Sequence, residues 1–457
     1  MMDTATAARA VDGSVIGDTV AFSRVTTDTR GLIRGDLFVA LQGERFDGHD
    51  FVAAAVQAGA VAALVERSRA PSLTGNLIAV DDPLKALAAL ATFWRGRFDI
   101  PVAVVTGSNG KTTTKEMIAA IFRAAAGDAA VAATPGNFNN AIGLPLALLA
   151  LRSAHRLAVF EIGMNHRGET RELAAIAQPT IAVITNAQRE HQEFMRNVDE
   201  VAAEHADTIT SLRAHGTAVV NADDARAALW RDAAAAASAR IVTFGLDQPA
   251  DVSARYAAHR DGGALELAMP AGHAHIVLHA PGRHMASNAL AAAAVAHAAQ
   301  LPVTAIVHGL EAFRPVRGRL VTVTTPADVT VIDDSYNANP DSVRAAVDVL
   351  AARPRPRWLV LGDMGEVGDA GAAFHAEIGA YAREAGVERM LAIGVLSRNA
   401  VRAFGAGAEH FESVDTLAQR VAGDVRAGVT VLVKGSRFMR MERVVAALTG
   451  QDRGGAH

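Results

Sequence analysis

Short, continuous apolar runs recur along the middle of the chain, and each run ends in a polar residue. The runs between residues 101 and 221 close at Thr106, Glu161, Asn186 and Asn221. A continuous apolar run indicates a strand that is covered on both faces, as in a parallel sheet. Helix-forming stretches lie between the runs. We therefore expect an α/β fold with a doubly wound sheet, whose ligands bind beyond the carboxyl ends of its strands.

The same pattern divides the chain into three parts. Residues 1–97 hold short apolar runs between Gly- and Asp-rich turns, which predicts a small mixed α/β domain. Residues 98–313 carry the parallel-sheet pattern and are expected to bind ATP. Apolar runs alternate with helical segments again over 314–457, which predicts a second, Rossmann-like unit. The boundary falls at the Arg- and Pro-containing segment 313–319.

Composition narrows the class of protein. The 457 residues carry a net charge of -4 and no basic block, so nucleic-acid binding is not expected. With no cysteine, disulfides and thiolate metal sites are excluded. No apolar run reaches the length of about 18 residues that spans a bilayer. The first thirty residues also lack the pattern of a secretion signal. We expect a cytoplasmic monomer without membrane insertion.

Lysine is unusually rare in this chain. Of 44 basic residues only four are lysine, at positions 85, 111, 115 and 434. Where any positive charge would serve, the chain uses arginine, so a retained lysine can mark a need for a compact ammonium group on a flexible stem. We interpret Lys111 and Lys434 in this way, and Lys85 and Lys115 as chance occurrences.

A glycine-rich segment, TGSNGKTT at residues 106–113, follows a predicted strand and precedes a helix expected over 111–126. Backbone N–H groups of such a loop can surround phosphate oxygens, Lys111 can reach the β- and γ-phosphates of ATP, and the Thr112 hydroxyl can bind Mg²⁺. The scarcity of lysine disfavours a plain glycine turn. The predicted ATP contacts in this loop are Gly107, Ser108, Asn109, Gly110, Lys111, Thr112 and Thr113.

Only two residues separate the glycines of this loop, and the shortened form resembles the loop of the Mur ligases and the folylpolyglutamate synthases. Both families activate a carboxylate with ATP and then attach an amine. Upstream, the segments 27–30 (TDTR), 35–41 (GDLFVAL) and 47–51 (DGHDF) are together similar to the uridine-nucleotide-binding domain of Mur ligases, which folylpolyglutamate synthases lack. The resemblance implies substrate contacts at Thr27, Asp28, Thr29, Arg30, Asp47 and His49.

Middle segments are also similar to Mur ligase motifs. TPGNFNN at 134–140 resembles the segment that meets the muramyl-peptide, and EIGMN at 161–165 resembles the segment whose glutamate binds magnesium. His191 aligns with a histidine assigned to a second metal, and the segment 281–290 with one that contacts adenine. The resemblance implies substrate contacts at Asn137, Asn139 and Asn140, metal ligands at Thr112, Glu161 and His191, an ATP contact at Asn288, and catalytic roles for Lys111, Glu161 and His191.

One position departs from the family pattern. Most Mur ligases place a carbamylated lysine where this chain has His205, and no lysine lies between Lys115 and Lys434. A carbamylated lysine in the middle domain is therefore excluded. Our hypothesis is that His205 or Glu204 takes over its role; alternatively, the second metal is held with fewer protein ligands.

The last part resembles the branch of the family that adds D-alanyl-D-alanine. The segment 331–340 (VIDDSYNANP) carries most of this likeness, and LGDMGEVG follows at 361–368. The Asp-x-Pro-Arg-type motif of the branches that add lysine or a diamino acid is absent from the sequence. The resemblance implies ATP contacts at Arg319 and Asp334, and substrate contacts at Tyr336, Asn337, Asn339 and Lys434.

Together these likenesses cover nearly the whole chain and imply an ATP- and Mg²⁺-dependent ligase of peptidoglycan precursor synthesis. It would join D-alanyl-D-alanine to UDP-N-acetylmuramoyl-tripeptide, with diaminopimelate or lysine as the third residue, through an acyl phosphate. A hinge near 314–319 would close the last domain over this intermediate. The alternatives are another amide ligase of the superfamily, which adds one amino acid, recycles a peptide or extends folate, and a non-catalytic nucleotide switch.

Overall fold

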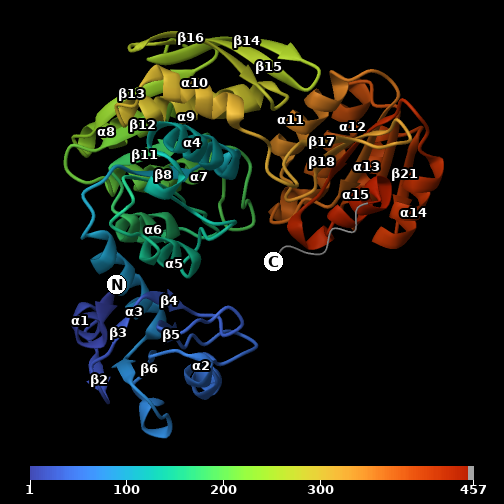
Figure 1. Cartoon of the computed structure of the whole chain (residues 1–457). Helices are drawn as coiled ribbons and strands as arrows, with labels where there is room; N and C mark the ends of the chain where they lie inside the picture. Colours follow the sequence, from blue (N-terminus) through green and yellow to red (C-terminus); the bar gives the residue numbers. More distant parts are fainter. Residues whose placement is uncertain (451–457) are drawn as a thin grey trace.

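The computed structural model describes residues 1–450 and shows three units, each built on its own sheet (Figure 1). The N-terminal unit has a five-stranded sheet in the order β2-β7-β6-β5-β4, with a two-stranded pair β1-β3 beside it. Its elements are β1 (Met2–Asp3), α1 (Thr4–Ala10), β2 (Ser14–Ile16), β3 (Ala21–Phe22), β4 (Arg24–Thr26), β5 (Asp36–Val39), α2 (Val52–Ala58), β6 (Ala62–Glu66), β7 (Leu77–Val80) and α3 (Pro83–Arg95).

The central unit has a nine-stranded sheet in the order β16-β15-β14-β13-β12-β11-β8-β10-β9. Its elements are β8 (Val102–Thr106), α4 (Lys111–Ala126), β9 (Val131–Ala133), α5 (Gly143–Leu149), β10 (Leu157–Glu161), α6 (Glu169–Ala177), β11 (Ile181–Ile184), α7 (Val198–Thr210), β12 (Thr217–Asn221), α8 (Ala227–Ala236), β13 (Arg240–Gly245), β14 (Val252–His259), β15 (Gly262–Met269), β16 (Gly272–Leu278), α9 (Arg283–Ala298) and α10 (Val303–Ala312).

The third unit has a six-stranded sheet in the order β17-β18-β22-β19-β20-β21, in which β17 is antiparallel. Its elements are β17 (Val321–Thr324), β18 (Thr330–Asp334), α11 (Pro340–Ala351), β19 (Arg357–Gly362), α12 (Gly371–Glu384), β20 (Arg389–Ile393), α13 (Ser397–Phe404), β21 (Ala408–Phe411), α14 (Val414–Asp424), β22 (Thr430–Lys434) and α15 (Glu442–Thr449).

The expected parallel α/β pattern is confirmed in the central unit. β8, β10 and β11 pair in parallel, and the helix predicted over 111–126 is α4. The antiparallel strands β14, β15 and β16, which extend this sheet at one edge, were not among the predicted elements. Along β16, exposed residues alternate with half-buried or buried ones, as in a sheet with one face in water. Among residues 1–450, no helix is both long and apolar enough to span a bilayer.

The chain order places the ends of three strands together. After β8 the chain crosses to the edge strand β9 and returns as β10 on one side of β8, and β11 then pairs on the other side. Such a reversal of strand order opens a crevice at the carboxyl ends of the strands. The predicted phosphate loop follows β8, and Glu161 ends β10, so both lie at this crevice.

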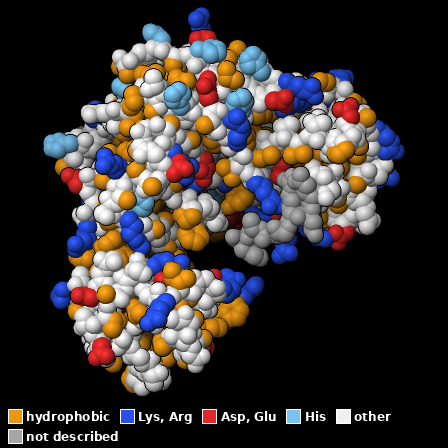
Figure 2. Space-filling model, viewed as in Figure 1, with side chains coloured by type: hydrophobic (Ala, Val, Ile, Leu, Met, Phe, Trp, Pro, Cys, Tyr) orange, Lys and Arg blue, Asp and Glu red, His pale blue; other side chains and the backbone are white. Residues whose placement is uncertain are grey.

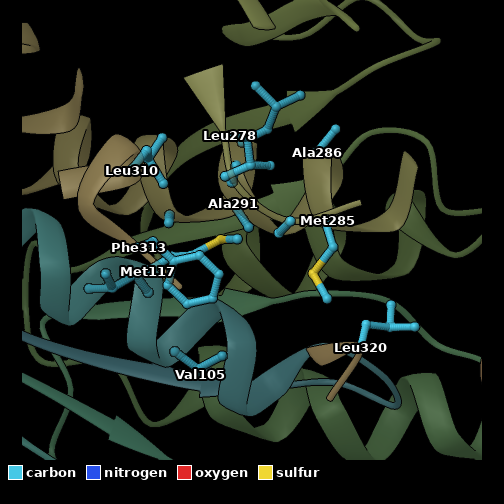
Figure 3. Close-up of a cluster of buried hydrophobic side chains, with 14 of the residues drawn as sticks. Val105, Met117, Leu278, Met285, Ala286, Ala291, Leu310, Phe313 and Leu320 are labelled. Atoms are coloured by element: carbon cyan, nitrogen blue, oxygen red, sulfur yellow. The ribbon is translucent and has the colours of Figure 1, made fainter. Parts of the chain in front are cut away.

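Helices α4, α9 and α10 pack against one face of the central sheet. Met117 of α4, Ala291 of α9 and Leu310 of α10 belong to one buried apolar cluster, which Val105 of β8 also joins (Figure 3). α10 lies so close to α4 that a Cβ atom on Gly309 would stand 2.4 Å from Cα of Ile121. This contact holds the helix that begins at Lys111 in a fixed position.

The close approach of α10 to α4 predicts a large stability effect at Gly309. Gly309→Ala forces two helix backbones apart, and we expect it to lower the free energy of unfolding by about 1–3 kcal/mol, as overpacked cores do. Denaturant unfolding followed by circular dichroism measures the change. Gly423→Ala, in α14, is the control, because no neighbouring atom lies within 4 Å of its added Cβ. Unchanged stability of the Gly309 variant would contradict the helix contact.

Candidate active site

A cleft of about 1600 Å³ lies where the central and third units meet, at the carboxyl ends of their strands. Figure 2 shows the surface hollowed between the units. Most of the predicted site residues of these two units line it. They are Ser108, Asn109, Gly110, Lys111, Thr112, Thr113, Asn139, Asn140, Glu161, His191, Asn288, Arg319, Asp334, Tyr336, Asn337, Asn339 and Lys434.

Both glycines of the phosphate loop are required by their surroundings. Gly107 and Gly110 have φ angles of 130° and 83°, a region that side chains disfavour. A Cβ on Gly107 would stand 2.0 Å from the Thr185 hydroxyl, and one on Gly110 would stand 2.3 Å from the Asn288 amide oxygen. The loop is therefore pressed against β11 and α9, and Gly110 leads directly into α4. This is the arrangement of a phosphate site at a helix N-terminus.

Polar residues that follow β11 anchor the loop. The backbone N–H of Asn109 donates to the Asn186 side chain over 2.9 Å, and its amide nitrogen donates to the Gln188 side chain over 2.6 Å. The Gln188 N–H donates to the Ser108 hydroxyl over 2.8 Å. Gln188 was not among the predicted site residues, although its place after a strand end could have indicated it. These bonds hold the loop in one shape before any ligand is bound.

The Lys111 ammonium is held by a buried carboxylate. Its Nζ lies 3.3 Å from Oε2 of Glu190, and Oε1 of Glu190 lies 3.0 Å from Nε2 of the fully buried His205. Burial would raise the pKa of the Glu190 carboxyl, but Lys111, His205 and His191 together lower it to about 2. Glu190 therefore stays ionised at any ordinary pH. The sequence prediction missed it, although it directly precedes His191.

The two residues proposed to replace the carbamylated lysine face in different directions. Glu204 accepts the N–H groups of Gly168 and Thr170, each over 2.9 Å, at the start of α6. His205 instead connects Glu190 to the hydroxyl of Thr106, 3.1 Å from its Nδ1, immediately before the phosphate loop. His205 is therefore linked to the phosphate loop through Thr106 and Glu190, whereas Glu204 stabilises the N-terminal end of α6.

Glu161 has the environment of a cation ligand. Its backbone N–H donates to the Thr134 hydroxyl over 2.9 Å, and Asn139 donates to Oε1 over 2.8 Å. Oε2 is buried and has no hydrogen-bond partner, although the side chain lines the cleft. A buried carboxylate oxygen without a partner is costly unless a cation meets it. The Glu161 side chain therefore fits Mg²⁺, which takes oxygen ligands.

His191 lines the same cleft, between Glu190 and Glu366 of the third unit. Its Nε2 is 3.7 Å from Glu190 Oε2, and its Nδ1 is 2.6 Å from Glu366 Oε2, outside hydrogen-bond alignment. Within residues 1–450, no three His, Asp or Glu side chains form a ready metal cluster. Mg²⁺ commonly uses one or two protein ligands and takes the rest from phosphate and water. Thr112 and Glu161 fit that pattern.

Lys115 does not meet the expectation of a chance lysine. It is fully buried, and its ammonium donates to the backbone oxygen of Thr134 over 2.9 Å and pairs with Glu116. It thereby ties α4 to the loop that positions Glu161. Lys85, in contrast, is 87% exposed.

The third unit contributes a second cationic group. Lys434, at the end of β22, donates to Asp334 over 2.5 Å and to the backbone oxygen of Asn337 over 2.9 Å. Burial raises the pKa of the Asp334 carboxyl despite the charge of Lys434. The Arg319 guanidinium lies 4.4 Å from the centre of the Tyr336 ring. The predicted ATP and substrate contacts of this unit thus adjoin one another.

The predicted substrate contacts of the N-terminal unit lie outside this cleft. Asp28 pairs with Arg30 over 2.7 Å on the surface. His49 is buried; its Nδ1 lies 2.6 Å from Asp47, and its Nε2 accepts the Glu66 N–H over 2.9 Å. Both nitrogens are satisfied within the unit. The remaining predicted residues that do not line the cleft are Thr27, Thr29, Gly107 and Asn137.

Comparison with known proteins identifies the class. The model of the Mur ligase middle domain matches residues 105–296, that of the glutamate ligase domain matches 318–437, and that of the Mur ligase family catalytic domain matches 21–95. A relative from Escherichia coli K12 is also 37% identical to this chain over nearly its full length. The chain belongs to the Mur ligase family, and the predicted resemblance is confirmed.

Three of the similar proteins belong to the branch of the family that adds D-alanyl-D-alanine. The relative from Escherichia coli K12, UDP-N-acetylmuramoyl-tripeptide–D-alanyl-D-alanine ligase, is 37% identical over 445 residues, 96% of each chain. MurF from Acinetobacter baumannii has a TM-score of 0.90 and 33% identity, covering 98% of this chain and 99% of that one. MurF from Thermotoga maritima, solved in complex with ADP, has a TM-score of 0.81 and 26% identity, covering 93% and 97%.

The Glu190–Lys111 contact predicts a kinetic effect. Glu190→Gln keeps the size of the side chain but removes the charge that holds the ammonium. A hydrogen bond to a charged group contributes about 1.5–3 kcal/mol, so we expect turnover of ATP to fall roughly 10-fold to 100-fold. Phosphate release at saturating substrates measures it. Glu193→Gln, on an exposed side chain nearby, should keep normal turnover. Equal rates for both variants would disprove the role of Glu190.

Proposed function

We propose that this chain is an ATP-dependent ligase that adds D-alanyl-D-alanine to UDP-N-acetylmuramoyl-tripeptide in peptidoglycan precursor synthesis. The observation that carries the proposal is the shared cleft, in which the loop around Lys111 faces Asp334 and Lys434 of the third unit. Support also comes from the named relatives, which match along almost their entire length. A nucleotide switch would not need a third unit whose charged residues line the same cleft as the phosphate loop.

The proposed reaction has two steps. A carboxylate oxygen of the tripeptide attacks the γ-phosphorus of ATP, the bond to the bridging oxygen breaks, and ADP leaves. The amine of D-alanyl-D-alanine then attacks the acyl carbon, an amide bond forms, and phosphate leaves as the amine loses a proton. The protein contributes mainly orientation and charge stabilisation.

The charge stabilisation comes from side chains of both the central and the third unit. The Lys111 ammonium and the N–H groups at the start of α4 spread the negative charge that develops on the γ-phosphate. Thr112 and Glu161, with His191 close by, would hold Mg²⁺, which supplies further positive charge to the phosphate oxygens. Lys434 and Arg319 add positive charge from the third unit. Asn288 is proposed to contact adenine.

We assign the three parts of the chain to three ligands. Residues 1–97 bind the uridine nucleotide, with contacts among Thr27–Arg30 and Asp47, whose carboxylate the buried His49 holds in place. Residues 98–313 bind ATP, and residues 314–457 bind the amine. Positions 451–457 of the last part lie outside the described residues. Asn137, Asn139 and Asn140 meet the muramyl-peptide, and Tyr336, Asn337 and Asn339 meet D-alanyl-D-alanine. We also propose that the chain acts as a monomer, in the cytoplasm.

The Lys111 ammonium predicts a large loss of activity on its removal. Lys111→Ala leaves Glu190 without its cation and ATP without its main positive contact. We expect phosphate release to fall at least about 100-fold, as when a charge-stabilising donor is removed from an active site. Lys85→Ala, which removes an exposed lysine, is the control and should be fully active. Normal peptide extension by the Lys111 variant would refute the proposed site.

The identity of the amine and the need for magnesium can be tested together. With ATP and UDP-N-acetylmuramoyl-tripeptide, we expect phosphate release with D-alanyl-D-alanine and little with single amino acids. Chelation by EDTA should abolish it, and added Mg²⁺ should restore it, because Glu161 and Thr112 then regain their cation. Preference for a single amino acid, or for glutamate on folate, would identify a different branch of the superfamily.

A further inference from the structure

Residues 186–193, which connect β11 to α7, touch the phosphate loop on one side and the third unit on the other. Towards the loop, Asn186 and Gln188 bind Asn109, and Glu190 binds Lys111. Arg189 lies between Gln188 and Glu190 in the sequence, and its side chain contacts the third unit instead. Neighbouring positions of one short segment therefore face the two parts that must come together during the reaction.

The Arg189 guanidinium binds two carboxylates of the third unit. Its Nη2 lies 2.7 Å from Oδ1 of Asp341, in the first turn of α11, and its Nη1 lies 2.7 Å from Oε2 of Glu377, on α12. The backbone N–H of Arg189 also donates to Asp341, over 2.8 Å. The face of the guanidinium lies 5.1 Å from the centre of the Phe374 ring. All four contacts cross between the units.

Other contacts from the same region accompany this one. The side-chain amides of Asn109 and Asn339 donate to each other over 2.9 and 3.2 Å, so the phosphate loop itself touches the start of α11. The Glu193 N–H donates to the backbone oxygen of Glu366 over 3.2 Å. Arg189 is central among these contacts, and it is half-buried, where charge pairs are screened less than on the surface.

We infer that Arg189 is a positioning residue that couples docking of the third unit to the placement of Lys111. When Asp341 and Glu377 hold Arg189, the adjoining Glu190 is fixed, and with it the Lys111 ammonium at the phosphate loop. Docking of the third unit, which binds the amine, therefore stabilises the position of Lys111 that ATP cleavage needs. The placement of Lys111 stabilises docking in return, because coupling between two sites is reciprocal. The inference rests on the proposed function, and it adds that ATP is cleaved when the third unit is docked.

Arginine is suited to this role by its shape. Its planar fork can form paired bonds with one carboxylate and still reach a second, which the single ammonium of lysine cannot do. Arg344 also contacts Glu377, over 3.1 Å, but it lies on α11 of the same unit, and among residues 1–450 it forms no ion pair with the central unit. Arg344 therefore provides a matched control for the loss of one arginine beside Glu377.

The experiment compares Arg189→Ala, Arg189→Lys and Arg344→Ala in the full chain. ATP, UDP-N-acetylmuramoyl-tripeptide and D-alanyl-D-alanine are supplied, and phosphate and the amide product are measured separately. For Arg189→Ala we expect kcat to fall about 10-fold, within the usual range of coupling between sites, with an unchanged KM for the UDP substrate. We also expect more than one phosphate per amide bond, because a poorly docked third unit leaves the acyl phosphate open to water.

The controls separate coupling from simple loss of stability. Arg344→Ala should keep wild-type kcat and one phosphate per amide bond, and Arg189→Lys should lie between Arg189→Ala and the wild type. If Arg189→Ala does not fold, the phosphate-to-amide ratio of Arg189→Lys decides in its place. A wild-type ratio and kcat in the Arg189 variants, or an equal defect in Arg344→Ala, would overturn the inference. A wild-type protein that releases no phosphate would instead overturn the proposed function.

Discussion

The active cleft depends on the buried carboxylate of Glu190. A carboxylate removed from water is costly unless opposite charges and donors surround it. Lys111 and His205 meet this need from two different helices, α4 and α7, with His191 close by. The same pairing sets the Lys111 ammonium at the phosphate loop. Because an unpaired Glu190 would be costly, the Lys111 ammonium stays beside it, where it can meet the phosphates of ATP.

The units differ in how they are joined. Apolar residues of the N-terminal unit, such as Leu64, share one cluster with Val102 and Phe160 of the central unit, so these two units form a continuous core. The third unit also shares a buried apolar cluster with the central unit, in which apolar residues of α9 and α11 lie together. At the cleft, however, it meets the phosphate loop and residues 186–193 through amides and ion pairs. Polar contacts of this kind can be made and broken at less cost than a buried apolar core. The contacts at the cleft thus suit a site that must admit one substrate and then exclude water.

The sequence predicted the parallel strands correctly, but it missed the antiparallel strands and the burial of one charged residue. Continuous apolar runs located β8, β10 and β11, because strands covered on both faces must be apolar throughout. The strands β14–β16 escaped prediction, since a sheet with one wet face gives a weaker pattern. Lys115 was misjudged because burial of a charge depends on its partner, here the carbonyl of Thr134, which lies in another element.

The sequence by itself determined the parallel α/β core, the phosphate loop and its family, because these depend on local order: an apolar run, two glycines, a lysine and a helix. Tertiary structure alone decided which charges meet. Glu190 and His205 lie fifteen positions apart, and Arg189 and Glu377 lie in different units, yet each pair is in contact. Such contacts arise when packing brings distant segments together and the desolvated charges must then be paired, and no local pattern records that outcome.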